Sequence, residues 1–372
     1  MQNSWKTRWI FLRQDTLPKK DGQIYTPEMK AGIKITQKYM LDRLLMLTAP
    51  AVMAWYAYGE RAVRLMVISV LTAVVCEYVG HRIVKTVPTP RDLSAVATGV
   101  IVALCLPASS PFWLVMLATS FAVLVAEIPF GNARSLLFSP AAAGLAFVTV
   151  CLPEYTFGYS VLSDAGKSPA VFGSADFSAG MSLSGMLASG TSMGGSLVNY
   201  MDILTGSLPS AMGTGCVLAL LGALLFLAVR RPKGFTAAIS CLLSAAVFAF
   251  LFPRITTGRL QSVFMELSGG MLFFIALFLL PDEALLPNRF WGRVLYGVCA
   301  GLFCMLFRTF GEFEEGAVFA VLLVNALRAA FEKLPYTKRE KHQLSEARRA
   351  AREVQTEALP AGDDAEGGVR NG

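Results

Sequence analysis

The protein has 372 residues, of which 54% are hydrophobic and only 16% are charged. Water-soluble chains carry about a quarter of charged residues, so this composition excludes an ordinary soluble domain. The net charge of +7 does not indicate nucleic-acid binding, because the basic residues lie in the terminal segments and short loops. They form no stripe with interleaved aromatic residues, and anionic lipid headgroups are the partner that this pattern favours.

The first 43 residues are basic and hold no long apolar run, which excludes a cleavable signal peptide and predicts a cytoplasmic segment over 1–43. Long uncharged runs then follow one another. We predict an all-α, polytopic membrane protein of about ten transmembrane helices, at 44–59, 62–84, 94–108, 112–129, 137–152, 214–230, 235–252, 261–281, 293–308 and 316–332. Several are shorter than the ~20 residues of a full crossing, which is typical of half-broken helices buried among neighbours.

Loop charges predict the orientation in the membrane. Lys and Arg gather before the first span, after the last span and in four of the connections. Since basic residues collect in cytoplasmic loops, we place the chain in a bacterial inner membrane with both termini in the cytoplasm. Only the loop carrying Arg254 and Arg259 disagrees. The tail over 333–372 is predicted to be cytoplasmic, with a helical pattern from Lys338 to Ala358 and a disordered, Pro-, Gly- and acid-rich end.

The two halves of the chain repeat similar residues. Phe112-Trp113 opens one span as Phe290-Trp291 opens another, and Leu106-Pro107 ends one span as Leu280-Pro281 ends a later one. These correspondences favour a repeat of five helices. Because five is odd, the second copy is inverted in the membrane, and inverted repeats often build a central site at the midplane.

On this reading the repeats cover 44–152 and 214–332, and the connection at 153–213 lies on the outer side. A loop this long is either disordered or functional. Its stretch from Ala188 to Gly195 combines hydroxyls with glycines. Glycines let a backbone approach a phosphate, and a hydroxyl can accept one as an ester, although Ser and Gly are also what ordinary loops contain.

Three carboxylates lie within or at the edges of apolar spans: Glu77, Glu127 and Glu266. Such a group costs several kcal/mol unless it is protonated, paired or solvated. Glu127 is placed to pair with Arg134, and Glu266 with either arginine of the exceptional loop. Glu77 and Glu266 are therefore candidates for an ion path.

No metal site is predicted. The seven cysteines are scattered, mostly in apolar runs and without a CxxC pair, and the two histidines have no companion ligands nearby. The thiols are expected to pack as small apolar groups.

Three stretches carry a family resemblance. Asp92–Gly99 reads D-L-S-A-V-A-T-G, Glu315–Ala326 reads E-G-A-V-F-A-V-L-L-V-N-A, and Met201–Gly213 has the spacing M-D-x-x-x-G-x-x-P-x-x-x-G. Together they resemble motifs of the D-type subunit of the Rnf electron-transport complex and of the related B-type subunit of the Na⁺-translocating NADH:quinone reductase. The resemblance runs from about residue 40 to 332.

This resemblance implies a membrane subunit of an oxidoreductase complex. Such a complex passes electrons between a low-potential donor such as ferredoxin and NAD, and couples this to movement of Na⁺ or H⁺. The partners implied are the other subunits of the complex. Asp92, Asp282, Glu77 and Glu266 are the residues to test for the ion path, although span-edge carboxylates such as Asp92 and Asp282 are often simply solvated.

The resemblance also implies a flavin. In this family FMN is joined by a phosphoester to a hydroxyl of an S-G-A-T motif, and the matching positions here are Ser189, Gly190, Thr191 and Ser192. Ser192 stands at the acceptor position, with Thr191 one residue earlier. The motif thus departs from the family, and the sequence leaves open whether the flavin is covalent and whether riboflavin binds as well.

Two other functions fit the same spans. An inverted-repeat transporter or channel for a small solute, without flavin, would explain the altered acceptor motif. A structural subunit that has lost its cofactor is the third reading.

Overall fold

The computed structural model describes residues 27–84, 93–130, 136–159, 180, 182–188, 200–254, 258–311, 313 and 315–333, with the backbone alone over 27–37. Every regular element within these ranges is a helix, which confirms the predicted all-α class. The helices of the first half are α2 (Pro27–Tyr58), α3 (Glu60–Val84), α4 (Ser94–Cys105), α5 (Phe112–Phe121) with its π-helical continuation η1 (Ala122–Glu127), and α6 (Pro140–Cys151).

The second half is likewise helical. It contains α11 (Val217–Arg230), α12 (Pro232–Leu251), α13 (Arg259–Ser268), α14 (Leu272–Phe278), α15 (Phe290–Phe310), α16 (Ala317–Ala326) and α17 (Arg328–Phe331). Three short helices lie in the described parts of the connection between the halves: α7 (Pro153–Thr156), α9 (Leu183–Ala188) and α10 (Tyr200–Thr205).

The lengths of the helices agree with a membrane protein built partly from short segments. Within the described residues, α3, α12 and α15 are long and apolar enough to cross a bilayer. The pair α13 and α14 passes the same test jointly but is bent by 55° at its break. Five shorter apolar segments accompany them: α4, α5 with η1, α6, α11 and α16.

Two of the short helices, α4 and α14, occupy the interior. All seven residues of α14 are buried, and so are ten residues of α4, from Ser94 to Cys105. A helix end exposed to hydrocarbon would leave backbone groups without partners. Short helices are therefore stable only where protein surrounds their ends, and here the longer helices supply that surrounding.

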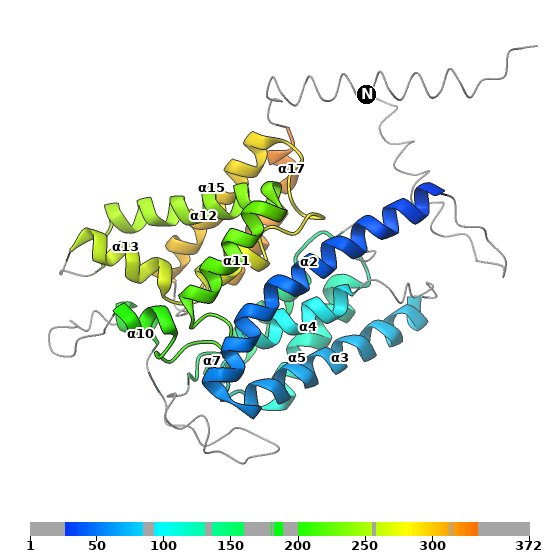
Figure 1. Ribbon diagram of the computed structural model, residues 1–372, viewed down its shortest axis with the longest axis horizontal. Coiled ribbons are helices and arrows are strands. Elements are labelled where there is room, and N and C mark those ends of the chain that lie inside the picture. Colours follow the sequence, from blue (N-terminus) through cyan, green and yellow to red (C-terminus); the bar gives the residue numbers. More distant parts are fainter. Residues whose placement is uncertain are drawn as a thin grey trace, which may run out of the picture.

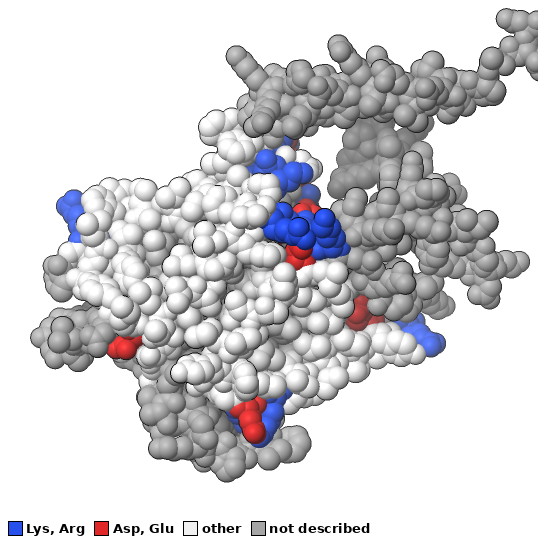
Figure 2. Space-filling model, in the orientation of Figure 1, with Lys and Arg blue, Asp and Glu red and all other residues white. Residues whose placement is uncertain are grey.

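The outer surface is largely apolar. Large hydrophobic side chains on α3 are exposed, among them Leu71 at 60% and Ile83 at 72%. Figure 2 shows one face of the molecule, where charged atoms gather in a few groups and a broad uncharged surface separates them. Such a surface is unfavourable in water and favourable in a bilayer, so this is a membrane protein.

Two sequence expectations change in detail. The first helix begins at Pro27, well before the apolar run at 44, because the helix continues through its charged first turns. The region over 153–213 contains three short helices where the sequence offers almost no apolar periodicity. Residues 1–26 and the tail from 334 onward lie outside the described residues.

Helices α12 and α15 pack at very close range through small residues. Gly297 and Gly301, four residues apart on α15, face the carbonyls of Ala237 and Cys241 on α12. A Cβ atom at either glycine would collide with those carbonyls. This is the G-x-x-x-G arrangement, in which missing side chains let two helix backbones approach within a membrane.

The two halves meet through α2 with α11 and through α6 with α16. Figure 1 shows α2 running between α11 and α4. The segment before α11 donates two backbone hydrogen bonds to the end of α4, from Gly213 to Leu104 O at 2.7 Å and from Met212 to Leu106 O at 3.1 Å. In the opposite direction, Arg43 of α2 donates to Phe278 O at the end of α14 at 2.8 Å.

The α12–α15 contact gives a test of packing. We expect Gly297→Ala to lower the free energy of unfolding by about 1–3 kcal/mol, because the added methyl overfills the contact. Gly222→Ala on the exposed face of α11 meets no atom within 4 Å and should not destabilise. Thermal unfolding of the purified protein in detergent measures both, and equal melting temperatures for the two variants would contradict the packing described.

Candidate functional site

The break between α13 and α14 is the most irregular part of the buried backbone. Helix α13 ends at Ser268, and α14 begins only at Leu272. Between them Gly270 has φ +69°, a conformation that residues with a Cβ rarely adopt. A Cβ there would also collide with the carboxylate of Glu315. Glycine is thus required both by the turn and by the charged group packed against it.

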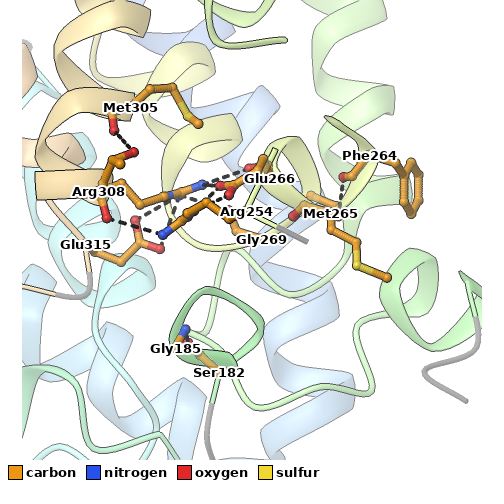
Figure 3. Close-up of polar contacts among 12 residues, drawn as sticks. Ser182, Gly185, Arg254, Phe264, Met265, Glu266, Gly269, Met305, Arg308 and Glu315 are labelled. Carbon is orange, nitrogen blue, oxygen red and sulfur yellow. Dashed lines mark hydrogen bonds and ion pairs between the residues drawn. The ribbon is translucent and has the colours of Figure 1, made fainter. Parts of the chain in front are cut away.

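A buried network of two arginines and two glutamates surrounds this break (Figure 3). Arg308 Nη1 donates to Glu266 Oε2 at 3.1 Å, and Arg308 Nη2 donates to Glu315 Oε2 at 3.1 Å. Arg254 binds the same Glu266 in a bidentate manner, with Nε–Oε1 at 2.6 Å and Nη2–Oε2 at 2.8 Å. Only 1% of the Arg308 side chain and 2% of the Glu266 side chain are exposed.

Arg308 also satisfies the end of α13. Its Nη1 donates to Glu266 O at 2.8 Å, and its Nη2 donates to Gly269 O at 3.1 Å. Carbonyls in the last turn of a helix lack partners within the helix, and a cation is favoured there by the helix dipole. One guanidinium therefore neutralises two carboxylates and completes a broken helix. The charges of the two arginines and two glutamates sum to zero. Their mutual attraction offsets the desolvation cost of burying them.

A small cavity lies beside the break. It has a volume of about 20 Å³, room for roughly one water molecule. Its walls come from the break, from the start of α9 and from the segment before α11, and they include Ser182, Leu183, Ser210, Thr214, Gly215, Ser268, Gly269 and Gly270. The Ser210 hydroxyl is buried there without a hydrogen-bond partner. Figure 3 shows Ser182 of this wall, whose hydroxyl accepts a hydrogen bond from Gly185 N at 3.0 Å.

The acceptor residues predicted for a flavin, Ser189, Gly190, Thr191 and Ser192, lie outside the described residues, and so does Asp92. Their described flanks are α9, which ends at Ala188, and α10, which begins at Tyr200. An open groove of about 530 Å³ starts at α10 and is lined by Tyr200, Arg259 and Phe264 together with residues 258, 260 and 261. The Tyr200 and Phe264 rings meet edge to face at 5.6 Å.

The three described ion-path candidates lie in two places. Glu266 belongs to the buried network, whereas Asp282 forms an ion pair with Arg43 at 3.0 Å at the other end of α14. Glu77 lies on α3, with its carboxylate 3.9 Å from His81 Nε2. Glu77 and Asp282 both lie within electrostatic range of the same buried carboxylate, Glu127. Glu266 does not belong to this group.

Of the two arginines expected to pair with Glu266, Arg254 forms the ion pair. The other, Arg259, has its guanidinium 5.6 Å from the centre of the Phe250 ring. Arg254 is thus held by a buried carboxylate, which explains why it departs from the sorting of loop charges. Sequence reasoning missed the roles of Arg308 and Glu315. The available signal was an arginine and a glutamate seven residues apart on either side of Gly311, next to apolar spans.

No group of three or more His, Cys, Asp or Glu residues in the described part of the chain is arranged to hold a metal ion. All seven cysteines are free thiols, four of them buried, in agreement with their expected role as small apolar side chains.

The fold and the network define a class: a multi-pass membrane protein of apolar helices with a broken helix held by buried charges. The sequence matches the NQR2, RnfD, RnfE family over residues 25–341. The chain belongs to this family.

Several relatives are D-type subunits of ion-translocating complexes. The chain is 27% identical over 302 residues to the D-type subunit of the Na⁺-translocating ferredoxin:NAD⁺ oxidoreductase complex of Acetobacterium woodii, covering 80% of this chain and 88% of the relative. It is 26% identical over 299 residues to the proton-translocating counterpart of Clostridium ljungdahlii, covering 80% and 89%. It is 29% identical over 320 residues to the D-type subunit of the ion-translocating oxidoreductase complex of Klebsiella pneumoniae, covering 78% and 90%.

The network gives a second test. Arg308→Met leaves Glu315 without a cation and the end of α13 without its donor, so we expect the free energy of unfolding to fall by about 3–5 kcal/mol. The matched control is Arg64→Met, which breaks a pair whose side chains are 42% and 82% exposed and should cost less than about 1 kcal/mol. Urea or thermal unfolding in detergent measures the difference, and two similar losses would show that the buried network contributes little.

Proposed function

We propose that this protein is the membrane subunit of an ion-translocating electron-transport complex of the ferredoxin:NAD⁺ oxidoreductase type. It carries electrons through a bound flavin and couples this transfer to movement of Na⁺ or H⁺. The observation that carries the proposal is the family match over 25–341, together with relatives that are D-type subunits and align with about four fifths of the chain. Its partners are then the other subunits of the complex.

The flavin in this proposal is FMN, joined through its phosphate to Ser192 or Thr191. The described surroundings suit such an attachment. The small cavity near the flanks of that segment has glycine walls and an unpartnered Ser210 hydroxyl, which accommodate a polar group at close range. The cavity is too small for the isoalloxazine ring. In this proposal it therefore serves the phosphate attachment, and the ring lies elsewhere.

The groove at α10 is the described surface that suits the ring. Tyr200 and Phe264 offer aromatic faces and Arg259 offers a positive charge. Aromatic side chains favour stacking with a planar ring, and a cation stabilises the negative charge that a reduced flavin carries. When bound, the flavin supplies the electron transfer, while the protein supplies its position and surroundings.

The proposal includes ten spans arranged as two inverted repeats. The five units of the first half correspond in order to five units of the second half. Helices α2 and α3 correspond to α11 and α12, α4 corresponds to the pair α13 and α14, α5 with η1 corresponds to α15, and α6 corresponds to α16. Corresponding helices meet each other, α2 with α11 and α6 with α16, as elements near a two-fold axis do. Leu104 and Phe278, each two residues before a Leu-Pro pair, both accept a hydrogen bond from the opposite half.

For the ion path, Asp282 and Glu77 are the stronger described candidates, because both flank a buried carboxylate. Glu266 is held by two guanidiniums and fits a structural role better. Asp92 stays a candidate from the sequence. The surrounding membrane is the bacterial inner membrane, with both termini in the cytoplasm and the 153–213 connection on the outer side.

Mass spectrometry tests the flavin. The full chain is produced in a host with the flavin transferase, and we expect one FMN on a peptide covering 180–213. Ser192→Ala or Thr191→Ala should abolish the modification, whichever residue is the acceptor. Ser189→Ala, which removes a nearby hydroxyl of the same stretch, should retain it. A bare peptide from the unmutated chain would contradict the covalent flavin.

Side-specific labelling tests the arrangement in the membrane. In a cysteine-free background, Met201→Cys on α10 and Lys333→Cys after α17 provide exposed thiols on opposite predicted sides. A membrane-impermeant maleimide added to intact cells with a permeable outer barrier should label only the first. Labelling of both positions from the same side would be incompatible with ten spans and an outer 153–213 connection.

A further inference from the structure

Glu127 differs from every other buried carboxylate in the described part of the chain. Five acidic side chains there are buried: Asp42, Glu127, Glu266, Asp282 and Glu315. Four of them have an arginine within ion-pair distance, at 2.6–3.3 Å. Glu127 has no such cation among the described residues, although it is only 4% exposed.

The two oxygens of Glu127 have different surroundings. Oε1 accepts a hydrogen bond from the hydroxyl of Ser94, in the first turn of α4. Oε2 is buried and has no hydrogen-bond partner. An ionised carboxylate in this position would keep one buried oxygen without a hydrogen bond or ion pair from the described residues, at a cost of several kcal/mol.

The backbone directs Glu127 into this position. Helix α5 passes into the π-helix η1, where Ile128 N donates to Val123 O, five residues earlier, at 3.0 Å. Each π turn holds an extra residue, and such turns are frequent at functional sites. The resulting turn carries Glu127 toward Ser94 and toward the face of α3 on which Gly80 packs against Ile128.

The charged groups around Glu127 do not neutralise it. Glu77 of α3 and Asp282 after α14 are the acidic groups within electrostatic range of Glu127, and Arg43 of α2 is the basic group, outside ion-pair distance. Arg43 is already bound to Asp282 at 3.0 Å. His81 lies one turn beyond Glu77 on α3, and the described helices α4, α5 and α6 bring no charged side chain to the cluster.

We propose that Glu127 is a proton-binding site: its carboxyl group takes up one proton from water and releases it again, with Ser94 as its fixed hydrogen-bond donor. The proposed ligand is a proton, for which the single unpartnered oxygen Oε2 is sufficient. The site is separate from the predicted flavin segment. It can be examined in the isolated full chain without flavin or partner subunits, so its failure would leave the electron-transport proposal standing.

Infrared spectroscopy of the full chain in lipid nanodiscs tests this. At about pH 7 exposed carboxyls, with pKa values near 4, are ionised, so a carbonyl band of a protonated carboxylic acid, shifted in D₂O, reports a buried acid. We expect the band in the unmutated protein and its loss in Glu127→Gln. The exposed control Glu60→Gln should retain the band.

A second variant keeps the test decisive if Glu127→Gln folds poorly. Ser94→Ala removes the hydroxyl that stabilises the ionised form, so the band should persist to higher pH than in the unmutated protein. The proposal is overturned if the unmutated protein lacks the band at neutral pH, or if well-folded Glu127→Gln keeps it. Loss of the band on replacing K⁺ by Na⁺ at constant pH would also overturn it, since Na⁺ would then be the ligand.

Discussion

Arginine side chains that donate to backbone carbonyls are what allow this chain to bury short helices. In hydrocarbon no water satisfies the last turn of a helix, and a guanidinium has five donors in a fixed fork. Arg308 serves the end of α13, Arg43 the end of α14, and Arg61 the carbonyls of Ala108 and Ser110 after α4. Without these donors, the interior ends of the helices would be orphaned, and only full-length spans would be stable.

One of these arginines, Arg43, lies where the two halves meet. Arg43 and Asp42 lie side by side on α2, and Asp42 binds Arg231 of the second half at 3.0 Å. Arg231 also pairs with Glu283, and its guanidinium lies 4.7 Å from the centre of the Tyr39 ring. These ion pairs add to the packing of α2 on α11 and of α6 on α16, and the buried apolar side chains of both halves form one continuous core. Within the second half, α12 and α15 are held by close backbone packing.

Much of the fold could be predicted from the sequence because apolar runs and loop charges directly reflect the lipid solvent. The helical class followed from that reasoning, and so did a partner for Glu266 among Arg254 and Arg259, of which the structure shows Arg254. The break at Gly270 could not be predicted, since a glycine in an apolar run is equally compatible with a continuous helix. The roles of Arg308 and Glu315 depend on three helices converging in space, and sequence spacing alone does not reveal such convergence. For Glu127, the nearby Arg134 suggested a local pair, but Arg134 lies outside the described residues.

The π turn at η1 has a consequence for comparing members of the family. A π turn is one residue longer than the α-helical turn it replaces, so it corresponds to a single inserted residue within an otherwise regular helix. A relative with one residue fewer between Phe121 and Ile128 would turn its glutamate by about 100° around the helix axis, away from the residue at the position of Ser94. The length of this segment, and not only the presence of an acid, therefore tells which members share the buried carboxyl.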